Sequence, residues 1–131
     1  MPPRESIVRT QHWRACHAFN STLAGWLVIA PVSHVTALDE LPAAAHAELG
    51  TLLGSLSAAL RAVTGCVKTY VMQFSEAEGF EHLHIHLVPR MADQPAQLKG
   101  PNVFGYLTDD ETRWLPEAER DRLALALRRR L

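Results

Sequence analysis

The sequence predicts one globular domain that combines β-strands with a long amphipathic helix. The chain has 131 residues, of which 47% are hydrophobic, and its apolar residues follow a strand period in some segments and a helix period in others. A chain of this length buries roughly two thirds of its unfolded surface, so its core requires neither a disulfide framework nor a metal ion. We therefore expect residues 1–131 to form a single domain.

Four segments have the character of strands. Over residues 12–19, aromatic and short residues alternate with others, which predicts an extended segment. Gly25 introduces the apolar run 26–30, which Pro31 closes because proline cannot donate to a strand ladder. Residues 66–74 alternate again, and a further strand over 82–88 ends at Pro89. The last two segments are close enough in sequence to pair as an antiparallel hairpin across the turn at 75–79.

Two helices are predicted. In the segment 42–65, apolar residues recur at the helical spacing, Pro42 suits the first turn and Gly65 the C-terminal end. Gly50 and Gly54 lower helix propensity, and we expect them to let this helix approach a neighbouring sheet. Residues 91–113 have no sustained period and form a long loop of the kind that borders sites, and 116–131 close the chain as a short helix.

Composition narrows the class of function. Thirteen Lys and Arg residues against 14 Asp and Glu give a formal net charge of −1, which disfavours a general nucleic-acid binder and favours a small ligand. Cys16 and Cys66 lack the spacing of a zinc ribbon or a dithiol redox centre. The first residues are polar, and no apolar run reaches the length of a membrane span, so we expect a cytoplasmic protein without membrane contact.

The most informative feature is three histidines at alternate positions, His82, His84 and His86. Successive side chains of a strand point to opposite faces, so the three imidazoles are predicted to share one face while Leu83, Ile85 and Leu87 pack into the core. Two adjacent imidazoles could share a zinc ion, although three ligands from one straight strand converge poorly. A second interpretation is hydrogen-bonded histidines without function.

A third interpretation makes the central histidine a nucleophile. Neutral imidazole can attack phosphorus and form a phosphorus–nitrogen bond that water later breaks, so one difficult displacement becomes two easier ones. Imidazole suits this chemistry because its ordinary pKa of about 6.5 keeps both of its protonation states accessible near neutrality. His12, His17 and His46 lie apart from this segment, and we expect them on the surface or on a helix face without a chemical role.

The segment His-Leu-His-Ile-His-Leu-Val that begins at His82 resembles the signature of the histidine triad superfamily, in which three histidines alternate with apolar residues. The resemblance extends to the strand that begins at Gly25 and ends near His34, and covers roughly residues 13–90. It implies an α+β fold with an antiparallel sheet of about five strands, usually paired as a homodimer. It also implies a nucleotide hydrolase or nucleotidyl transferase that acts at the α-phosphate of a nucleoside phosphoramidate or dinucleoside polyphosphate, without an obligatory metal or other cofactor.

By position, the resemblance makes His84 the nucleophile, with His82 and His86 as its catalytic supports. Asn20, Gln73 and His34 match positions that bind the nucleotide. Trp26 replaces a fourth family histidine and is predicted to be a core residue or a wall that stacks on the base. The turn before the triad carries glutamates where catalytic members commonly have phosphate donors, so a nucleotide-binding protein with little turnover is an alternative function.

Overall fold

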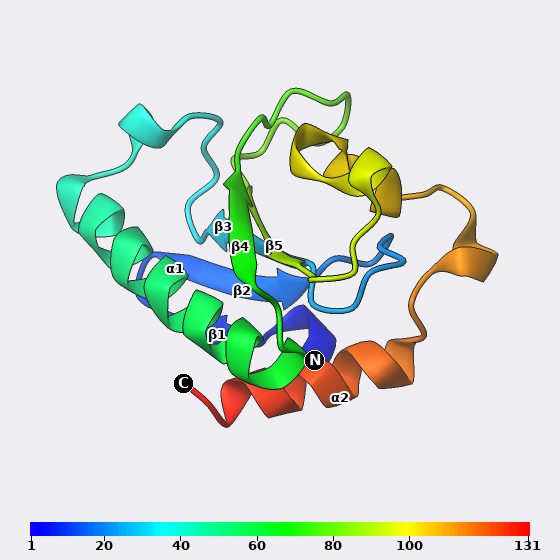
Figure 1. The fold of residues 1–131 in the computed structure, drawn as a ribbon. Helices are drawn as coiled ribbons and strands as arrows, with labels where there is room; N and C mark the ends of the chain where they lie inside the picture. Colours follow the sequence, from blue (N-terminus) through cyan, green and yellow to red (C-terminus); the bar gives the residue numbers. More distant parts are fainter.

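The computed structural model describes residues 1–131 as a five-stranded antiparallel sheet with helices on one face (Figure 1). The strands lie in the order β1-β2-β3-β5-β4. Their bounds are Val8–Arg9 for β1, Trp13–His17 for β2, Leu27–Pro31 for β3, Lys68–Met72 for β4 and Ile85–Arg90 for β5. The fold class predicted from the sequence, α+β with an antiparallel sheet of about five strands, is confirmed.

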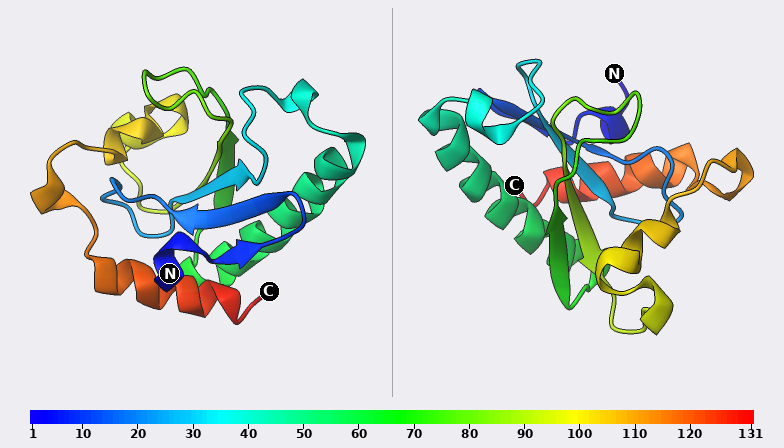
Figure 2. Two further views of the ribbon diagram at one scale, coloured as in Figure 1. Left: turned by 180° about the vertical axis from the view of Figure 1, so that it is seen from behind. Right: turned by 90° about the horizontal axis from the view of Figure 1, so that it is seen from above.

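Two α-helices, α1 (Ala43–Thr64) and α2 (Glu117–Arg128), pack on the same side of the sheet. Five short 3-10 segments complete the chain, η1 (Pro3–Glu5), η2 (Leu38–Glu40), η3 (Ala96–Leu98), η4 (Gly100–Tyr106) and η5 (Glu111–Arg113). The predicted loop at 91–113 therefore contains regular turns. Gly100 N–H donates to the Tyr70 hydroxyl at 3.1 Å, which fastens η4 over the other face of the sheet. In the left view of Figure 2, the turn between β4 and β5 and the yellow η4 both lie at the top of the molecule.

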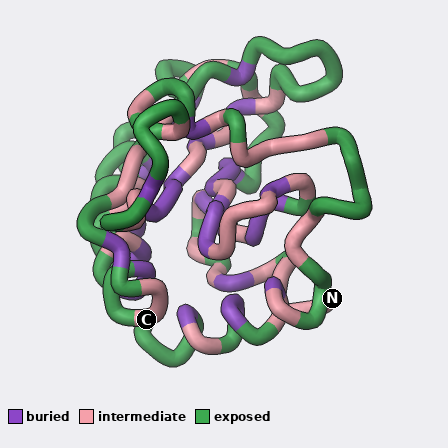
Figure 3. Tube along the Cα trace, turned by 45° about the vertical axis from the view of Figure 1, so that its right-hand side comes forward, coloured by how far each residue is buried: buried purple, intermediate pink, exposed green.

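The main core lies between the sheet and the two helices (Figure 3). Trp13 is fully buried there, and its indole N–H donates to the Ala45 carbonyl of α1 at 2.8 Å. A second, smaller cluster lies on the opposite face of the sheet, under η4, and is formed by Ala18, Trp26, Val88 and Val103. The rest of that face carries the histidines, and we call it the open face.

The long helix begins and ends as predicted. Pro42 is its N-terminal cap, Gly65 its C-terminal cap in the left-handed conformation at φ 73°, and leucines 52, 56 and 60 are buried. The expectation for Gly50 and Gly54 is wrong: a Cβ at either position meets nothing within 4 Å, because both face away from the sheet. Gly25 makes the close approach instead, since a Cβ there would lie 3.1 Å from Pro89 Cγ at a φ of 94°.

The predicted hairpin of β4 and β5 is confirmed, but its second strand has different bounds. It begins at Ile85 and continues through Pro89 to Arg90. Pro89 does not end the strand because β3 begins at Leu27, opposite Leu87. No neighbouring strand therefore lies on the β3 side of Pro89, and its missing N–H breaks no ladder hydrogen bond. The two-residue strand β1 was not predicted, because two residues carry no periodic signal.

Candidate active site

His84 is held by hydrogen bonds to both its backbone and its ring. Its backbone N–H donates to Ser75 Oγ at 3.2 Å, and Ser75 is buried with a positive φ of 55°. The ring Nδ1 lies 2.9 Å from the backbone oxygen of His82. A carbonyl oxygen only accepts, so Nδ1 carries the proton and donates, and Nε2 keeps its lone pair. Neutral His84 is therefore held in the tautomer that a nucleophile requires.

His86 is held in the complementary tautomer by Trp26. The indole Nε1–H of Trp26 donates to His86 Nδ1 at 3.0 Å, and because an indole nitrogen only donates, the proton of the neutral ring lies on Nε2. Burial lowers the pKa of His86 to about 4, and repulsion from a protonated His84 adds to this. The two rings meet edge to face, with centroids 4.9 Å apart. At neutral pH, His86 is thus an uncharged donor beside His84.

These two histidines line a hollow of about 410 Å³ on the open face, which we call the apolar hollow. Nine of its 13 lining residues are hydrophobic, and they include Phe19, Phe80, Phe104 and Leu107 beside the polar Asn20. Phe104, from η4, packs edge-on against both Trp26 and His86. The predicted long loop therefore does border the histidines. A mostly apolar cavity with a few polar groups is the usual form of a small-molecule site.

His82 lies outside the apolar hollow. Its ring stacks on His34, with centroids 4.6 Å apart and planes inclined by 15°. Both rings line a second hollow of about 400 Å³, shared with Arg9, Arg14, Pro31 and Val32, which we call the basic hollow. The structure thus divides the predicted row of imidazoles: His84 and His86 line one hollow, and His82 lines the other.

The remaining predicted residues lie in different places. Asn20 lines the apolar hollow. Trp26 also borders it, but the side chain is fully buried and acts on His86 through its N–H. Gln73 is exposed, does not line either hollow, and donates to Ser75 Oγ at 2.9 Å, so it lies behind the residue that holds His84.

His17 differs from expectation. It is buried, whereas we expected it on the surface or on a helix face. Its Nδ1 lies 2.8 Å from the Ala18 carbonyl oxygen and its Nε2 accepts from the Gly25 N–H at 2.9 Å, so the ring joins the end of β2 to the turn before β3. Burial is the main cause that lowers its pKa to about 4. His17 and Ser75 support the site, and no local sequence pattern marks either of them.

The fold is similar to that of several solved structures. A histidine triad protein from Sinorhizobium meliloti superimposes with a TM-score of 0.78 at 21% identity, over 96% of this chain and 88% of that one. A histidine triad protein from Bradyrhizobium japonicum superimposes with a TM-score of 0.77 at 21% identity, over 95% of this chain and 88% of that one. A histidine triad protein from Marinobacter aquaeolei superimposes with a TM-score of 0.75 at 22% identity, over 96% of this chain and 87% of that one. The chain has the histidine triad fold.

The fold that the histidine triad resemblance of the sequence implied is thereby confirmed. No protein-family model matches the sequence, and no curated protein matches it either. In this histidine triad fold, no three His, Cys, Asp or Glu side chains lie close enough together to hold a metal ion. Neither of its helices has the length and apolar content that crossing a bilayer requires.

Proposed function

We propose that this protein is a nucleotide hydrolase or nucleotidyl transferase in which His84 attacks the α-phosphate of a nucleoside phosphoramidate or dinucleoside polyphosphate. The observation that carries the proposal is the Nδ1–H hydrogen bond of His84 to the His82 carbonyl, which leaves the Nε2 lone pair free. His84 combines this free lone pair with access to the apolar hollow. His17 is bonded at both ring nitrogens, so it has no lone pair free for attack.

The apolar hollow supports a nucleoside as the bound group. Its half-exposed Phe19 and its Phe104 offer aromatic surface for a base, and Asn20 offers an amide for the ribose hydroxyls. Phe19 is itself held edge-on by Trp114, with ring centroids 5.2 Å apart. His84 and His86 line the same hollow, which supports a bound nucleotide whose α-phosphate lies at these histidines.

The reaction has two displacements. In the first, Nε2 of His84 forms a bond to phosphorus, the bond from phosphorus to the leaving oxygen or nitrogen breaks, and the electron pair stays on the leaving atom. A leaving phosphate departs as its anion, whereas a leaving nitrogen takes up a proton from water and departs as the amine. His86 donates its Nε2–H toward the phosphate as negative charge grows there. In the second, a water oxygen bonds to phosphorus, the phosphorus–nitrogen bond breaks, and the lone pair returns to Nε2 while the water releases its proton. This sequence uses no cofactor.

Trp26 acts in this scheme as a positioning residue. Were the proton of His86 on Nδ1, its Nε2 would present a lone pair to the phosphate and repel it. The indole N–H excludes that tautomer because it occupies the Nδ1 lone pair. We therefore assign Trp26 to orienting His86, in place of stacking on the base.

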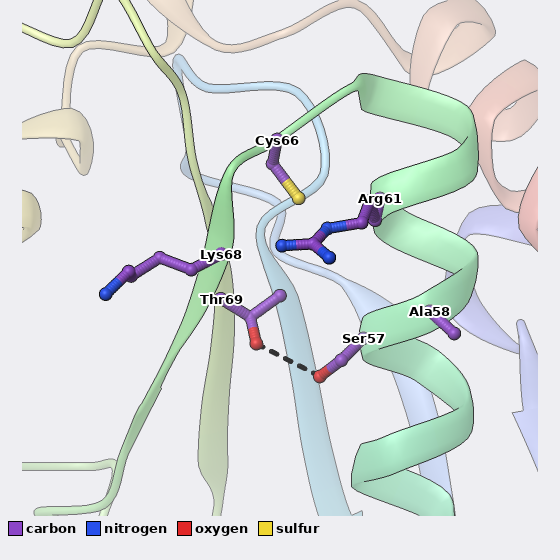
Figure 4. Close-up of a pocket in the computed structure, with 6 residues that line it drawn as sticks. All are labelled: Ser57, Ala58, Arg61, Cys66, Lys68 and Thr69. Atoms are coloured by element: carbon purple, nitrogen blue, oxygen red, sulfur yellow. Dashed lines mark hydrogen bonds between the residues drawn. The ribbon is translucent and has the colours of Figure 1, made fainter.

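We further propose that the protein pairs as a homodimer through β4 and α1. Strand β4 is the edge of the sheet, and its Val71 is 53% exposed. Gly50 and Gly54 face outward from α1, and a Cβ at either position would meet nothing within 4 Å. A hollow of about 540 Å³ separates the C-terminal part of α1 from β4, where Ser57 and Thr69 hydrogen-bond at 3.0 Å (Figure 4). Replacing Val71 by lysine is expected to shift the protein from dimer to monomer in size-exclusion chromatography with light scattering, and a monomeric wild type would contradict the proposal.

Intact-protein mass spectrometry tests the covalent step. The wild type, His84→Ala and His46→Ala are incubated briefly with nucleoside phosphoramidates and dinucleoside polyphosphates. We expect a nucleotidyl adduct on the wild type and on His46→Ala, because His46 is an exposed histidine of α1, and none on His84→Ala. An adduct on His84→Ala would refute the assignment of the nucleophile. Nucleotide binding with neither adduct nor product in the wild type would establish the alternative, a nucleotide-binding protein without turnover.

A further inference from the structure

The basic hollow lies on the same face of the sheet as the apolar hollow. It is lined by Arg9 of β1, Arg14 of β2, the stacked pair His34 and His82, and the chain end of β3 at Pro31 and Val32. Its volume of about 400 Å³ is close to the 410 Å³ of the apolar hollow. None of its lining residues is acidic. The open face therefore has one cationic cavity, which His82 lines, and one apolar cavity, which His84 lines two residues later in the chain.

The two arginines form an unfavourable pair when nothing is bound. Arg9 and Arg14 are direct partners in the antiparallel register of β1 and β2, where like charges destabilise a sheet. No carboxylate neutralises them, since the four ion pairs of the structure join other residues. Two guanidinium groups without a carboxylate partner are the complement of an anion.

The register of the sheet aligns this charge with the nucleophile. Arg9 lies opposite Arg14, and Arg14 lies opposite Ala30, so these three residues form one row across β1, β2 and β3. The pairing of β3 with β5 ends at Ile29 and Ile85, the residues that precede Ala30 and follow His84, so this row of charge runs toward the end of β5 at which His84 lies, roughly two strand spacings or 10 Å from Arg14. Ala30 is the small residue of this row between Arg14 and the end of β5.

Charge on the other side of His84 has the opposite sign. The turn between β4 and β5 carries Glu76, Glu78 and Glu81, all exposed, while its Ala77 and Phe80 line the apolar hollow. A phosphate chain that leaves the α-phosphate toward this turn meets negative charge, whereas one that crosses Ala30 meets two arginines. Burial is the main cause that lowers the pKa of His82; repulsion from His34, Arg14 and His84 adds to it, and the hydrogen bond to the Pro31 backbone opposes it.

We propose that the basic hollow is a leaving-group subsite, in which Arg9 and Arg14 bind the terminal phosphates of a substrate whose leaving group is a nucleoside diphosphate or longer phosphate chain. This inference rests on the proposed function and narrows it, because it selects dinucleoside polyphosphates over phosphoramidates. When the bond between the α-phosphorus and the bridging oxygen breaks, the electron pair stays on that oxygen as part of the β-phosphate. The guanidinium groups stabilise the negative charge that the leaving phosphate gains.

The test compares two adenosine substrates that differ in leaving group. Diadenosine triphosphate releases a nucleoside diphosphate, and adenosine 5′-phosphoramidate releases ammonia. We expect the double variant Arg9→Gln/Arg14→Gln to lower kcat/KM for diadenosine triphosphate by about 30-fold or more, and for the phosphoramidate by less than about threefold. Arg129→Gln/Arg130→Gln removes the same charge at exposed positions after α2, and it is expected to leave both values unchanged. If the double variant Arg9→Gln/Arg14→Gln loses kcat/KM equally with both substrates, or loses it with neither, the proposed subsite is overturned.

A binding experiment separates this inference from the proposed catalysis. Tripolyphosphate is titrated calorimetrically into His84→Ala, with and without the two Arg→Gln changes. We expect the arginine changes to weaken binding by about tenfold or more, and added salt to weaken binding to the parent. If the wild type turns over neither substrate but tripolyphosphate binds in an arginine-dependent way, the subsite stands and the catalysis fails. Tripolyphosphate binding that ignores the arginine changes would overturn the subsite even in an active enzyme.

Discussion

Replacing Trp26 by phenylalanine tests whether the indole N–H sets the chemistry of His86. Phenylalanine keeps an aromatic ring against His86 and Phe104 but removes the donor that lies 3.0 Å from His86 Nδ1. The lost hydrogen bond leaves a partly buried acceptor without its partner, which costs about 1 to 3 kcal/mol. His86 avoids this cost by moving its proton to Nδ1, and Nε2 then faces the phosphate as an acceptor.

The expected result is a loss of kcat of about 10- to 100-fold with little change in KM, since the donor acts mainly on charge that develops in the transition state. The free energy of unfolding is also expected to fall, because the smaller ring leaves a void at a fully buried position. ¹⁵N NMR of the imidazole nitrogens reports the tautomer directly: in the wild type, His86 Nδ1 is expected to show the shift of a lone-pair nitrogen and Nε2 that of a protonated one.

Trp26→His is the matched variant, because a histidine ring can restore an N–H donor toward His86. We expect Trp26→His to recover part of the activity that Trp26→Phe loses, although histidine fills less of the buried space at position 26 than phenylalanine does. The reasoning is refuted if Trp26→Phe keeps both its kcat and the His86 nitrogen shifts of the wild type. It is also refuted if the activity of the two variants follows only their thermal stability.

Three further predictions concern the residues that support the site. The His17 imidazole takes up a proton below about pH 6.5 in the unfolded chain, but only near pH 4 in the folded chain, where its pKa is about 4. Neutral His17 therefore contributes about 3 kcal/mol to the free energy of unfolding above pH 6.5, and this contribution is lost as the pH falls toward 4. Urea unfolding from pH 4.5 to 7.5 should show this slope, and His17→Gln should reduce it. Gly25→Ala should destabilise the fold by about 2 kcal/mol or more in the same assay, because φ is 94° and Pro89 lies 3.1 Å from the new Cβ, whereas Gly50→Ala in open space should stabilise it by up to about 1 kcal/mol. Ser75→Ala should lower kcat about tenfold with KM nearly unchanged, because His84 N–H loses its acceptor; an unchanged kcat would exclude a positioning role for Ser75.

Local patterns in the sequence were sufficient for much of the fold. The helix at 42–65 and the β4–β5 hairpin follow from periodicity, because burying one face of a helix or strand imposes a spacing that is visible in the residues. One error arose where the outcome depends on a distant neighbour, and another ran against a spacing that is visible in the sequence itself. Pro89 was expected to end β5, and whether a proline ends a strand depends on what lies opposite it. Gly50 and Gly54 were expected to face the sheet, although neither lies at the spacing of the buried leucines 52, 56 and 60.

The alternating histidines were informative for the same reason, since a strand period places Leu83, Ile85 and Leu87 in the core and leaves the imidazoles outside it. The residue types and their spacing were therefore enough to single out His84 within a histidine triad pattern. What each imidazole can do is a different matter, because it depends on which ring nitrogen carries the proton. That is set by the His82 carbonyl for His84 and by Trp26, 60 positions earlier, for His86.

Only the tertiary structure decided how the open face is divided. The sequence alone determined that the chain has strands, a long helix and three alternating histidines, because these are properties of neighbouring residues. It did not place Arg9 and Arg14 beside His34 and His82, since strand register and loop packing bring together residues that are up to 73 positions apart in the chain. Hydrogen bonds and charges act through space, so the tautomers of the histidines and the sign of the charge around them emerge only when the chain is folded.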